Sequence, residues 1–286
     1  PLSSKNFDGL DFPDLYFFQP KKLFLFKENK LAIKYLNCVI DDVDSDLDTI
    51  SLFSTTVESE ISNNIKIESR LTRDSYIEKV TTMLSKIQRG DIYEANFCQE
   101  FYATAQIDPL KTYFSLNSIS QTPFATFLKN GNHFLMSSSP ERYIKKEKNV
   151  ITSQPIKGTT RRSDNTSEDD DLKFVLKNDQ KERSENIMIV DLVRNDLSKI
   201  AKRGTVKVTE LCELHSFKQV HHMISTIEAE VLPTVSPVGV ISATFPMGSM
   251  TGAPKISAMM IIEALEETKR GLYSGAVGYF TPEGDF

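Results

Sequence analysis

The segment Gly248-Ser-Met-Thr-Gly-Ala-Pro-Lys255 is a loop of small residues that runs directly into a predicted helix. Backbone N–H groups at a helix N-terminus lack partners and lie at the positive end of the helix dipole, so such a loop suits a carboxylate or a phosphate. It is not a Walker A loop, because its lysine does not directly follow the second glycine. On these residues alone, a simple turn that starts the helix is as good an interpretation as anion binding.

The helix after this loop is predicted to begin at Pro254, which is accepted at the first helical position because the N–H that it lacks would be unpaired there. Residues 256–265 are apolar almost all round, which predicts a buried helix. A second helix is predicted from Asp74, because apolar residues recur there at helical spacing and Gly90 stands where a left-handed C-cap belongs.

Strand-like segments lie between these two helices, at residues 93–101, 124–128, 133–137 and 143–152. Four carboxylates at residues 168–171 mark a helix start, where the helix dipole favours negative charge, and helical patterning continues to Leu197. Strands followed by helices and then by strands again indicate a mixed α+β architecture rather than regular βαβ alternation.

The N-terminal residues 1–72 are predicted to form a short β-rich region, and residues 73–286 a second, larger domain. In the first region, residues 23–26 and 31–40 read as strands, because they are short apolar runs bounded by polar residues. The acidic stretch Asp41–Asp48 is predicted to be a solvated loop.

Composition excludes several classes of protein. The chain has 286 residues, a net charge of −5 with mixed signs, and three isolated cysteines. A nucleic-acid-binding surface would need a clustered excess of Lys and Arg, and neither a disulfide framework nor a zinc site fits these cysteines. No apolar run approaches the length of a membrane span, so a cytoplasmic location is expected.

Lys157 is followed by Gly158 and Thr159 at the end of a strand-like run, in the sequence PIKGT (155–159). A desolvated lysine can act as a nucleophile. A lysine in such a position is more often a surface residue, and the local pattern alone does not select it.

Glu182 and Glu185 lie three residues apart on one face of a predicted helix, close to Asp191, Arg194 and Asp196. Their oxygens could hold a hard cation, although a charged solvent-facing surface is the more usual case.

His221 and His222 lie in an apolar segment and would point to opposite faces of a strand, where a structural histidine is the usual outcome. Glu141 is either a general acid in a turn or the ion-pair partner of Arg142.

Seven segments, taken in order, resemble the chorismate-utilising enzyme family, which includes anthranilate, aminodeoxychorismate, isochorismate and salicylate synthases. They are GDIYEANF (90–97), SSPER (138–142), PIKGT (155–159), ENIMIVDLVRND (185–196), HHMIST (221–226), FPMGSMTGAPK (245–255) and RGLYSGAVGY (270–279). The resemblance implies the anthranilate synthase component I-like, chorismate-binding fold, with two large, mainly antiparallel sheets and flanking helices. Relatives continue for several tens of residues past the last segment, so the C-terminal part of the domain is expected to be missing.

The residue at position 157 decides which activity the resemblance implies. Anthranilate synthases similar to this chain have alanine at that position, whereas lysine marks the aminodeoxychorismate synthases. The implied reaction is the Mg²⁺-dependent conversion of chorismate and ammonia into 4-amino-4-deoxychorismate, on the route to 4-aminobenzoate and folate. Lys157 would form a covalent adduct at C2 of chorismate, and Glu141 would act as general acid and base at the departing 4-hydroxyl.

The same resemblance assigns the remaining site residues. Glu185, with Glu182, is implied for the magnesium site, where the ion would neutralise a substrate carboxylate. The residues implied for the chorismate pocket are Gly158, Thr159, His222, Ser249 and Thr251. A separate glutaminase subunit is the implied source of ammonia.

Glu94 departs from the family pattern. Many relatives with this lysine have glutamine there and isochorismate-type enzymes have lysine, so its role is open. Anthranilate synthase component I is the alternative activity, and an inactive chorismate-binding fragment is the alternative of another class.

Overall fold

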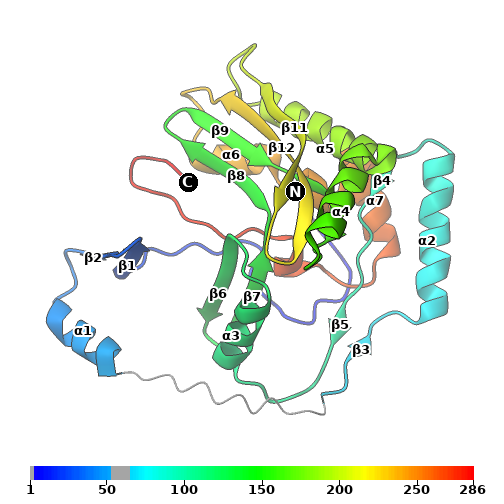
Figure 1. Cartoon of the computed structure of the whole chain (residues 1–286). Helices are drawn as coiled ribbons and strands as arrows, with labels where there is room; N and C mark the ends of the chain where they lie inside the picture. Colours follow the sequence, from blue (N-terminus) through cyan, green and yellow to red (C-terminus); the bar gives the residue numbers. More distant parts are fainter. Residues whose placement is uncertain (1–2, 53–64) are drawn as a thin grey trace. The chain divides into compact units, whose positions relative to one another are not determined.

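A computed structural model describes residues 3–52 and 65–286 (Figure 1). The described chain divides into two compact units, residues 12–52 and residues 3–11 together with 65–286. It mixes helices with sheets whose strand pairs are all antiparallel, which confirms the α+β class.

The smaller unit contains a hairpin of β1 (Lys22–Lys27) and β2 (Lys30–Tyr35), followed by α1 (Val43–Leu52). The prediction of a loop at residues 41–48 is therefore wrong for most of that stretch, because α1 begins at Val43. Two aspartates occupy the first turn of α1, where the helix dipole stabilises negative charge. One of them, Asp46, accepts hydrogen bonds from Lys22 on β1 and from the hydroxyl of Tyr35 on β2, which anchors the helix to the hairpin.

The main sheet of the larger unit has five strands: β8 (Arg142–Glu147), β9 (Val150–Gln154), β10 (Ile156–Arg161), β11 (Lys207–Ser216) and β12 (Val220–Glu230). The long strand β12 pairs along one edge with β11. Its other edge pairs first with β10 and then with β9, and only Pro155 separates those two strands. Because β12 lies between β11 on one side and β9 and β10 on the other, it holds together the strands that carry most of the candidate site.

Helices α4 (Thr166–Asn178) and α5 (Gln180–Ser198) pack on the main sheet (Figure 1). The carboxylates predicted to start a helix lie in α4, whose N-cap is Asn165. The core between the helices and the sheet is aliphatic and includes Ile151, Ile189 and Ile227, all of which are fully buried. Helices α4 and α5 thus cover one face of β12.

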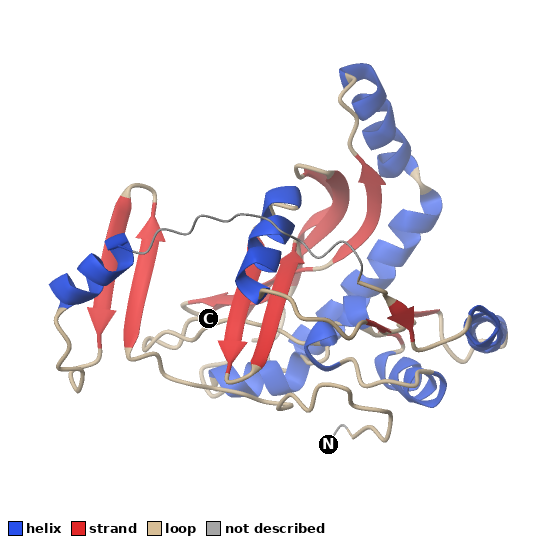
Figure 2. Ribbon diagram, turned by 90° about the horizontal axis from the view of Figure 1, so that it is seen from below, coloured by secondary structure: helices blue, strands red, loops and turns tan. Residues whose placement is uncertain are grey.

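A second group of elements surrounds the main sheet within the larger unit. Helix α3 (Pro109–Ile119) packs on the hairpin of β6 (Phe124–Asn130) and β7 (His133–Ser139), as Figure 2 shows. The other elements are β3 (Glu68–Ser69), β4 (Glu94–Ala95), β5 (Phe101–Tyr102), α6 (Pro237–Thr244), β13 (Gly252–Ala253) and two 3₁₀ turns (Gly248–Met250 and Gly271–Ser274).

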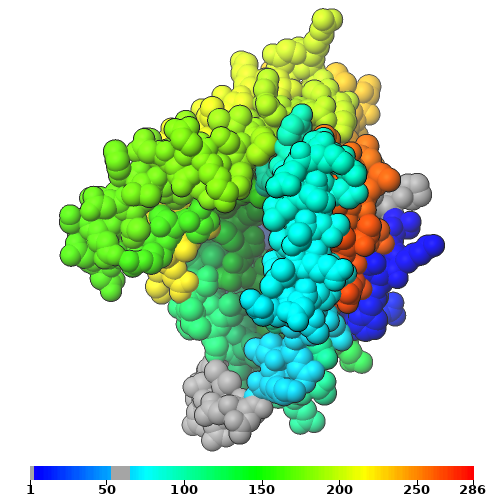
Figure 3. Space-filling model, turned by 90° about the vertical axis from the view of Figure 1, so that its right-hand side faces the viewer, coloured from blue at the N-terminus to red at the C-terminus, as the bar shows by residue number. Residues whose placement is uncertain are grey.

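Helices α2 (Arg73–Gln88) and α7 (Lys255–Leu265) lie side by side (Figures 1 and 3). The prediction for α2 is confirmed, since Thr72 caps its first turn and Gly90 has a φ of +84° just past its end. The prediction that α7 is buried all round is wrong: Ala258 and Ile262 are buried, whereas Ile256 and Met260 are 76% and 70% exposed. Among the described residues, α7 is covered on one face only.

No helix among the described residues is both long enough and apolar enough to cross a bilayer.

Candidate active site

Lys157 stands in a bulge of β10. The register between β10 and β12 changes from Ile156 opposite Ile224 to Thr159 opposite His222, so two residues of β10 face one residue of β12. The second residue of the bulge, Gly158, has a φ of +96°, a conformation that favours glycine.

The bulge directs the Lys157 side chain toward Glu94. The Lys157 Nζ lies 2.5 Å from the Glu94 Oε1, and the two side chains are only 19% and 12% exposed. The Asn186 amide of α5 donates hydrogen bonds of 3.2 Å to the carbonyls of Lys157 and Met223 and so ties the bulge to the helix. The lysine that the local sequence pattern did not select is therefore a largely buried, ion-paired group.

The small-residue loop before α7 holds Glu94 in place. Gly252 and Ala253 of β13 pair with Ala95 and Glu94 of β4, and the Asn96 N–H donates to the Thr251 carbonyl at 2.8 Å. A Cβ on Gly252 would lie 2.2 Å from the Glu94 carbonyl oxygen, so only glycine permits this approach. The loop therefore positions the partner of Lys157 in addition to starting a helix.

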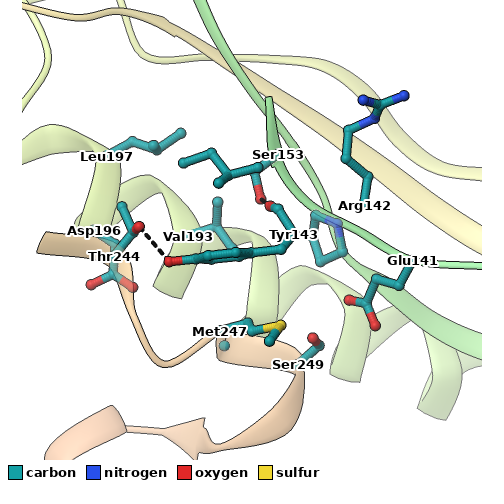
Figure 4. Close-up of a pocket in the computed structure, with 13 residues that line it drawn as sticks. Glu141, Arg142, Tyr143, Ser153, Val193, Asp196, Leu197, Thr244, Met247 and Ser249 are labelled. Atoms are coloured by element: carbon teal, nitrogen blue, oxygen red, sulfur yellow. Dashed lines mark hydrogen bonds between the residues drawn. The ribbon is translucent and has the colours of Figure 1, made fainter. Parts of the chain in front are cut away.

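Glu141 lies in a small pocket that Ser249 also lines (Figure 4). Its carboxylate accepts hydrogen bonds from the Ser249 hydroxyl and from the Ile156 N–H, the latter at 3.4 Å. Burial raises the pKa of Glu141 although the nearby Lys157 cation opposes that change. A buried carboxyl that keeps its proton at higher pH than usual is suited to act as a general acid.

Tyr143 also lines this pocket, and its hydroxyl lies 2.6 Å from the Thr244 hydroxyl (Figure 4). Burial raises the pKa of Tyr143 to about 12. Its phenol is therefore neutral at physiological pH and serves as a hydrogen-bonding wall.

His222 and Thr159 form a cross-strand pair beside the bulge. The Thr159 Oγ1 lies 2.8 Å from the His222 Nδ1, and the Phe217 ring packs edge-on to the imidazole at 5.4 Å. Burial lowers the pKa of His222, while a hydrogen bond with the Gly158 backbone acts in the opposite direction. A neutral imidazole held in this way can orient a polar substrate.

His221 points to the opposite face of β12, as its sequence position next to His222 predicts. It is fully buried, with its Nε2 2.9 Å from the Asp169 Oδ1 and its Nδ1 2.8 Å from the Ser216 hydroxyl. A hydrogen bond from Arg162 is the main cause that holds the pKa of Asp169 well below its usual range, and His221 contributes further. This histidine is structural.

The two carboxylates predicted for magnesium lie in the first turns of α5, and Glu182 lies next to the bulge. The Glu182 Oε2 lies 3.4 Å from the position that a Cβ on Gly158 would take, and Glu185 is 3.6 Å from Lys181. No group of three or more His, Cys, Asp or Glu side chains within residues 3–52 and 65–286 is arranged to hold a metal. Two carboxylate donors nevertheless fit Mg²⁺, which commonly takes one or two carboxylates and completes its octahedron with water and substrate oxygens.

The other charged residues predicted near that cation site are engaged elsewhere. Asp191 and Arg194 form an ion pair of 2.7 Å at the surface of α5, whereas Asp196 is buried and bound to Lys255. The hydroxyl of Thr251 is also engaged within the protein, because it donates to the carbonyls of Met247 and Gly248 in its own loop, each at 3.2 Å.

Sequence reasoning missed the role of Arg270. Its guanidinium binds the Glu266 carboxylate at 2.6 Å and the Asn96 carbonyl at 2.6 Å, and it also reaches the Met250 carbonyl. It therefore clamps the segment after Glu94 to the loop before Gly252. The signal in the sequence was an arginine and a glutamate one helical turn apart, which also describes many surface pairs.

A sequence profile of the chorismate binding enzymes matches residues 4–286. This chain belongs to the chorismate binding enzyme family. It is 40% identical over 214 residues to aminodeoxychorismate synthase component 1 of Escherichia coli K12, covering 75% of this chain and 47% of that protein. The chain thus spans about half the length of that relative.

Two further chorismate binding enzymes show the breadth of the match. Anthranilate synthase component 1 of Saccharolobus solfataricus is 34% identical over 275 residues, covering 96% of this chain and 63% of that protein. The crystal structure of anthranilate synthase component I from Streptococcus pneumoniae TIGR4 superposes with a TM-score of 0.85 at 27% identity, covering 98% of this chain and 65% of that one. These matches confirm the chorismate-binding fold that the sequence segments predict.

Proposed function

We propose that the complete polypeptide containing this chain is aminodeoxychorismate synthase component I, which converts chorismate and ammonia into 4-amino-4-deoxychorismate. The observation that carries the proposal is the placement of Lys157, a largely buried amine in a strand bulge between Glu94 and the acid Glu141. The 40% identity to the E. coli enzyme of that name supports it.

In the proposed reaction Lys157 acts as the nucleophile. The Lys157 ammonium first gives one proton to solvent; its amine then forms an N–C2 bond to chorismate, the two ring double bonds shift, and the C4–O bond breaks. Glu141 donates its proton to the departing hydroxyl, which leaves as water. Ammonia then forms an N–C4 bond while the C2–N bond to Lys157 breaks with its electron pair on the lysine, and Lys157 and Glu141 take up protons from solvent to regain their starting forms. Splitting one displacement into two is the general advantage of covalent catalysis.

The remaining residues bind and orient the substrate in this proposal. His222, fixed by Thr159, offers its Nε2 to a substrate oxygen, and Gly158 leaves room because a side chain there would contact Met223 and Glu182. Ser249 links Glu141 to the loop before α7.

Glu185 and Glu182 are the residues that would hold Mg²⁺. When bound, the ion would neutralise a substrate carboxylate and so lower the cost of holding an anion in a partly buried site. The designation "component 1" of the E. coli relative supports a second component, and we propose a glutaminase subunit that supplies ammonia.

Lys157→Ala tests the proposal. With chorismate, Mg²⁺ and ammonium chloride, we expect the complete parent enzyme to form the C4 amino product and, without ammonium, a covalent adduct on the Lys157-containing peptide seen by mass spectrometry. The variant should show neither. Lys145→Ala, which removes a half-exposed lysine on β8, is the matched control and should retain both. Amination by Lys157→Ala at the parental rate would exclude the nucleophile role, and anthranilate as the sole product of the parent would favour anthranilate synthase.

A further inference from the structure

Asn186 of α5 lies beside two bulges of the main sheet. The register of β10 on β12 changes within residues 156–159, and the register of β11 on β12 changes within residues 210–213. Both changes fall opposite residues 222–226 of β12, the strand that the two pairs share. A bulge takes backbone groups out of the ladder, and a buried backbone carbonyl then needs another donor. Asn186 is fully buried at this point and supplies that donor.

The Asn186 amide uses both its nitrogen and its oxygen. Its Nδ2 donates to the carbonyls of Lys157 in the β10 bulge and of Met223 on β12, each at 3.2 Å. Its Oδ1 accepts from the buried hydroxyl of Ser225, and that hydroxyl accepts from the Cys212 N–H of the β11 bulge at 2.9 Å. An amide turned by half a rotation would set its oxygen against two carbonyl oxygens. Ser225 therefore holds the amide in the orientation that serves the β10 bulge.

The β10 bulge decides where the Lys157 amine points. In a regular ladder that ran on from Ile156, Lys157 would stand opposite Met223. Directly opposed residues of two strands point to the same face of a sheet, and Met223 is fully buried in an apolar cluster. Without the bulge, the lysine would therefore be directed into this cluster and away from Glu94, which its Nζ contacts at 2.5 Å.

We propose that Asn186, oriented by Ser225, is the positioning residue for the Lys157 nucleophile. This inference rests on the proposed amination through Lys157. It adds a buried residue that acts only through the backbone of the bulge. A nucleophile reacts fast only when it is held close to its bonding geometry, and a displacement of about 1 Å can cost about 10²-fold in rate.

Asn186→Leu tests the proposal, because it removes both donors with little change in side-chain volume. The complete polypeptide is mixed with chorismate and Mg²⁺ without ammonium, and quenched samples are analysed by mass spectrometry for the adduct on the Lys157-containing peptide. We expect the maximal rate of adduct formation per folded molecule to fall about 10²-fold, while the chorismate concentration for half-maximal rate stays at the parental value. A merely structural role would lower the folded fraction, measured by thermal unfolding, and would leave the rate per folded molecule unchanged.

Ser225→Ala is the milder variant, and it decides the question if Asn186→Leu does not fold. It keeps the amide donors but releases the amide oxygen, so adduct formation should slow by about two- to tenfold, the effect of one hydrogen bond. Because Ser225 acts through Asn186, the double variant should be no slower than Asn186→Leu alone. Asn178→Leu is the matched control: it removes an exposed amide on α4 that donates to the Phe174 carbonyl at 2.8 Å, and it should keep the parental rate.

Three results would overturn this inference while the adduct in the parent upholds the proposed function. They are a parental rate per folded molecule in Asn186→Leu or Ser225→Ala, a loss that appears only in the half-saturating chorismate concentration, and effects of the two substitutions that multiply in the double variant. Absence of the Lys157 adduct from the parent would overturn the proposed function, and this inference with it.

Discussion

Lys255 at the start of α7 is bound to Asp196 near the end of α5. The same ammonium donates to the carbonyls of Thr244 at 3.0 Å and Pro246 at 2.6 Å. Burial lowers the pKa of Lys255, and the Asp196 carboxylate opposes that change. The lysine that closes the small-residue loop is thus the group that fixes the loop to the helix layer, and it is not a free phosphate-binding cation.

Removing this cation should destabilise the protein. Lys255→Met leaves the buried Asp196 with one partner fewer, and breaking a buried pair typically costs about 3–5 kcal/mol. The free energy of unfolding, from urea denaturation followed by circular dichroism, measures the effect. Lys269→Met, which breaks a more exposed pair with Asp8, should change it by about 0–1 kcal/mol. Equal losses in the two variants would show that burial does not strengthen the dependence on Lys255.

Gly252→Ala should damage the site through Glu94. The added methyl group would meet the Glu94 carbonyl at 2.2 Å and the Ala258 Cβ at 2.9 Å, so β4 must move away from β13. Overpacking of this kind costs about 1–3 kcal/mol, and the displacement of Glu94 should also reduce turnover. Gly278→Ala, with no atom within 4 Å of the new methyl group, is the control. Wild-type activity in Gly252→Ala would contradict the role of the close approach.

The pH dependence of kcat should show the titration of the Glu141 carboxyl. Because burial raises its pKa, the acid form persists above the usual glutamate range, and kcat should fall only as pH rises through that raised value. Glu141→Gln should lower kcat by about 10²–10⁴-fold and abolish this limb of the profile. A limb that survives in the variant would belong to another group.

The free energy of unfolding should also depend on the protonation of Glu141. A carboxyl with a raised folded-state pKa contributes stability that is fully present below its unfolded pKa and is lost as pH rises through the folded value. The stability of the parent relative to Glu141→Gln should therefore decline toward high pH, which denaturation at several pH values can measure.

The two faces of α7 should respond differently to truncation. Ile262→Ala removes buried aliphatic contacts with the cluster that contains Met83 and Ile92, at a typical cost of about 2–5 kcal/mol. Met260→Ala alters a side chain that is 70% exposed and should stay within about 0.5 kcal/mol of the parent. A large loss in Met260→Ala would show that a further part of the polypeptide or a partner covers this face.

Magnesium dependence should identify Glu185. Glu185→Gln removes an oxygen charge from the proposed metal site, so the Mg²⁺ concentration for half-maximal activity should rise by at least about tenfold. Asp191→Asn, on the same helix but exposed and paired with Arg194, should leave that concentration unchanged. The reverse order of sensitivity would place the metal elsewhere on α5.

Local signals in the sequence predicted the elements that local forces decide. The helix from Asp74 to its glycine C-cap and the helix start at residues 168–171 are set by capping and dipole effects that lie within a few residues. The same reasoning failed for α1 and α7. Aspartates in the first turn of α1 were compatible with either a loop or a helix, and the exposure of Met260 depends on what packs against α7.

The site itself was predicted mainly from resemblance, for a physical reason. Glu94 meets Lys157 only because β4 pairs with β13 and because β10 bulges at Gly158. The strand pairing and the bulge each depend on segments far apart in the chain. The residue pattern within any one segment therefore does not predict them. The ordered family segments carried that information, but they left Glu94 without a role, since it departs from the family pattern.

Alternate residues of β12 point to opposite faces of the sheet, so that one set packs in the core and the other lies at the candidate site. His221, Met223 and Ile227 pack toward the helices, whereas His222 and Thr226 contact Thr159 and Gln154. A single inserted or deleted residue in this strand would exchange the two sets, burying site groups and exposing the core. Natural selection should therefore remove insertions and deletions from residues 220–230.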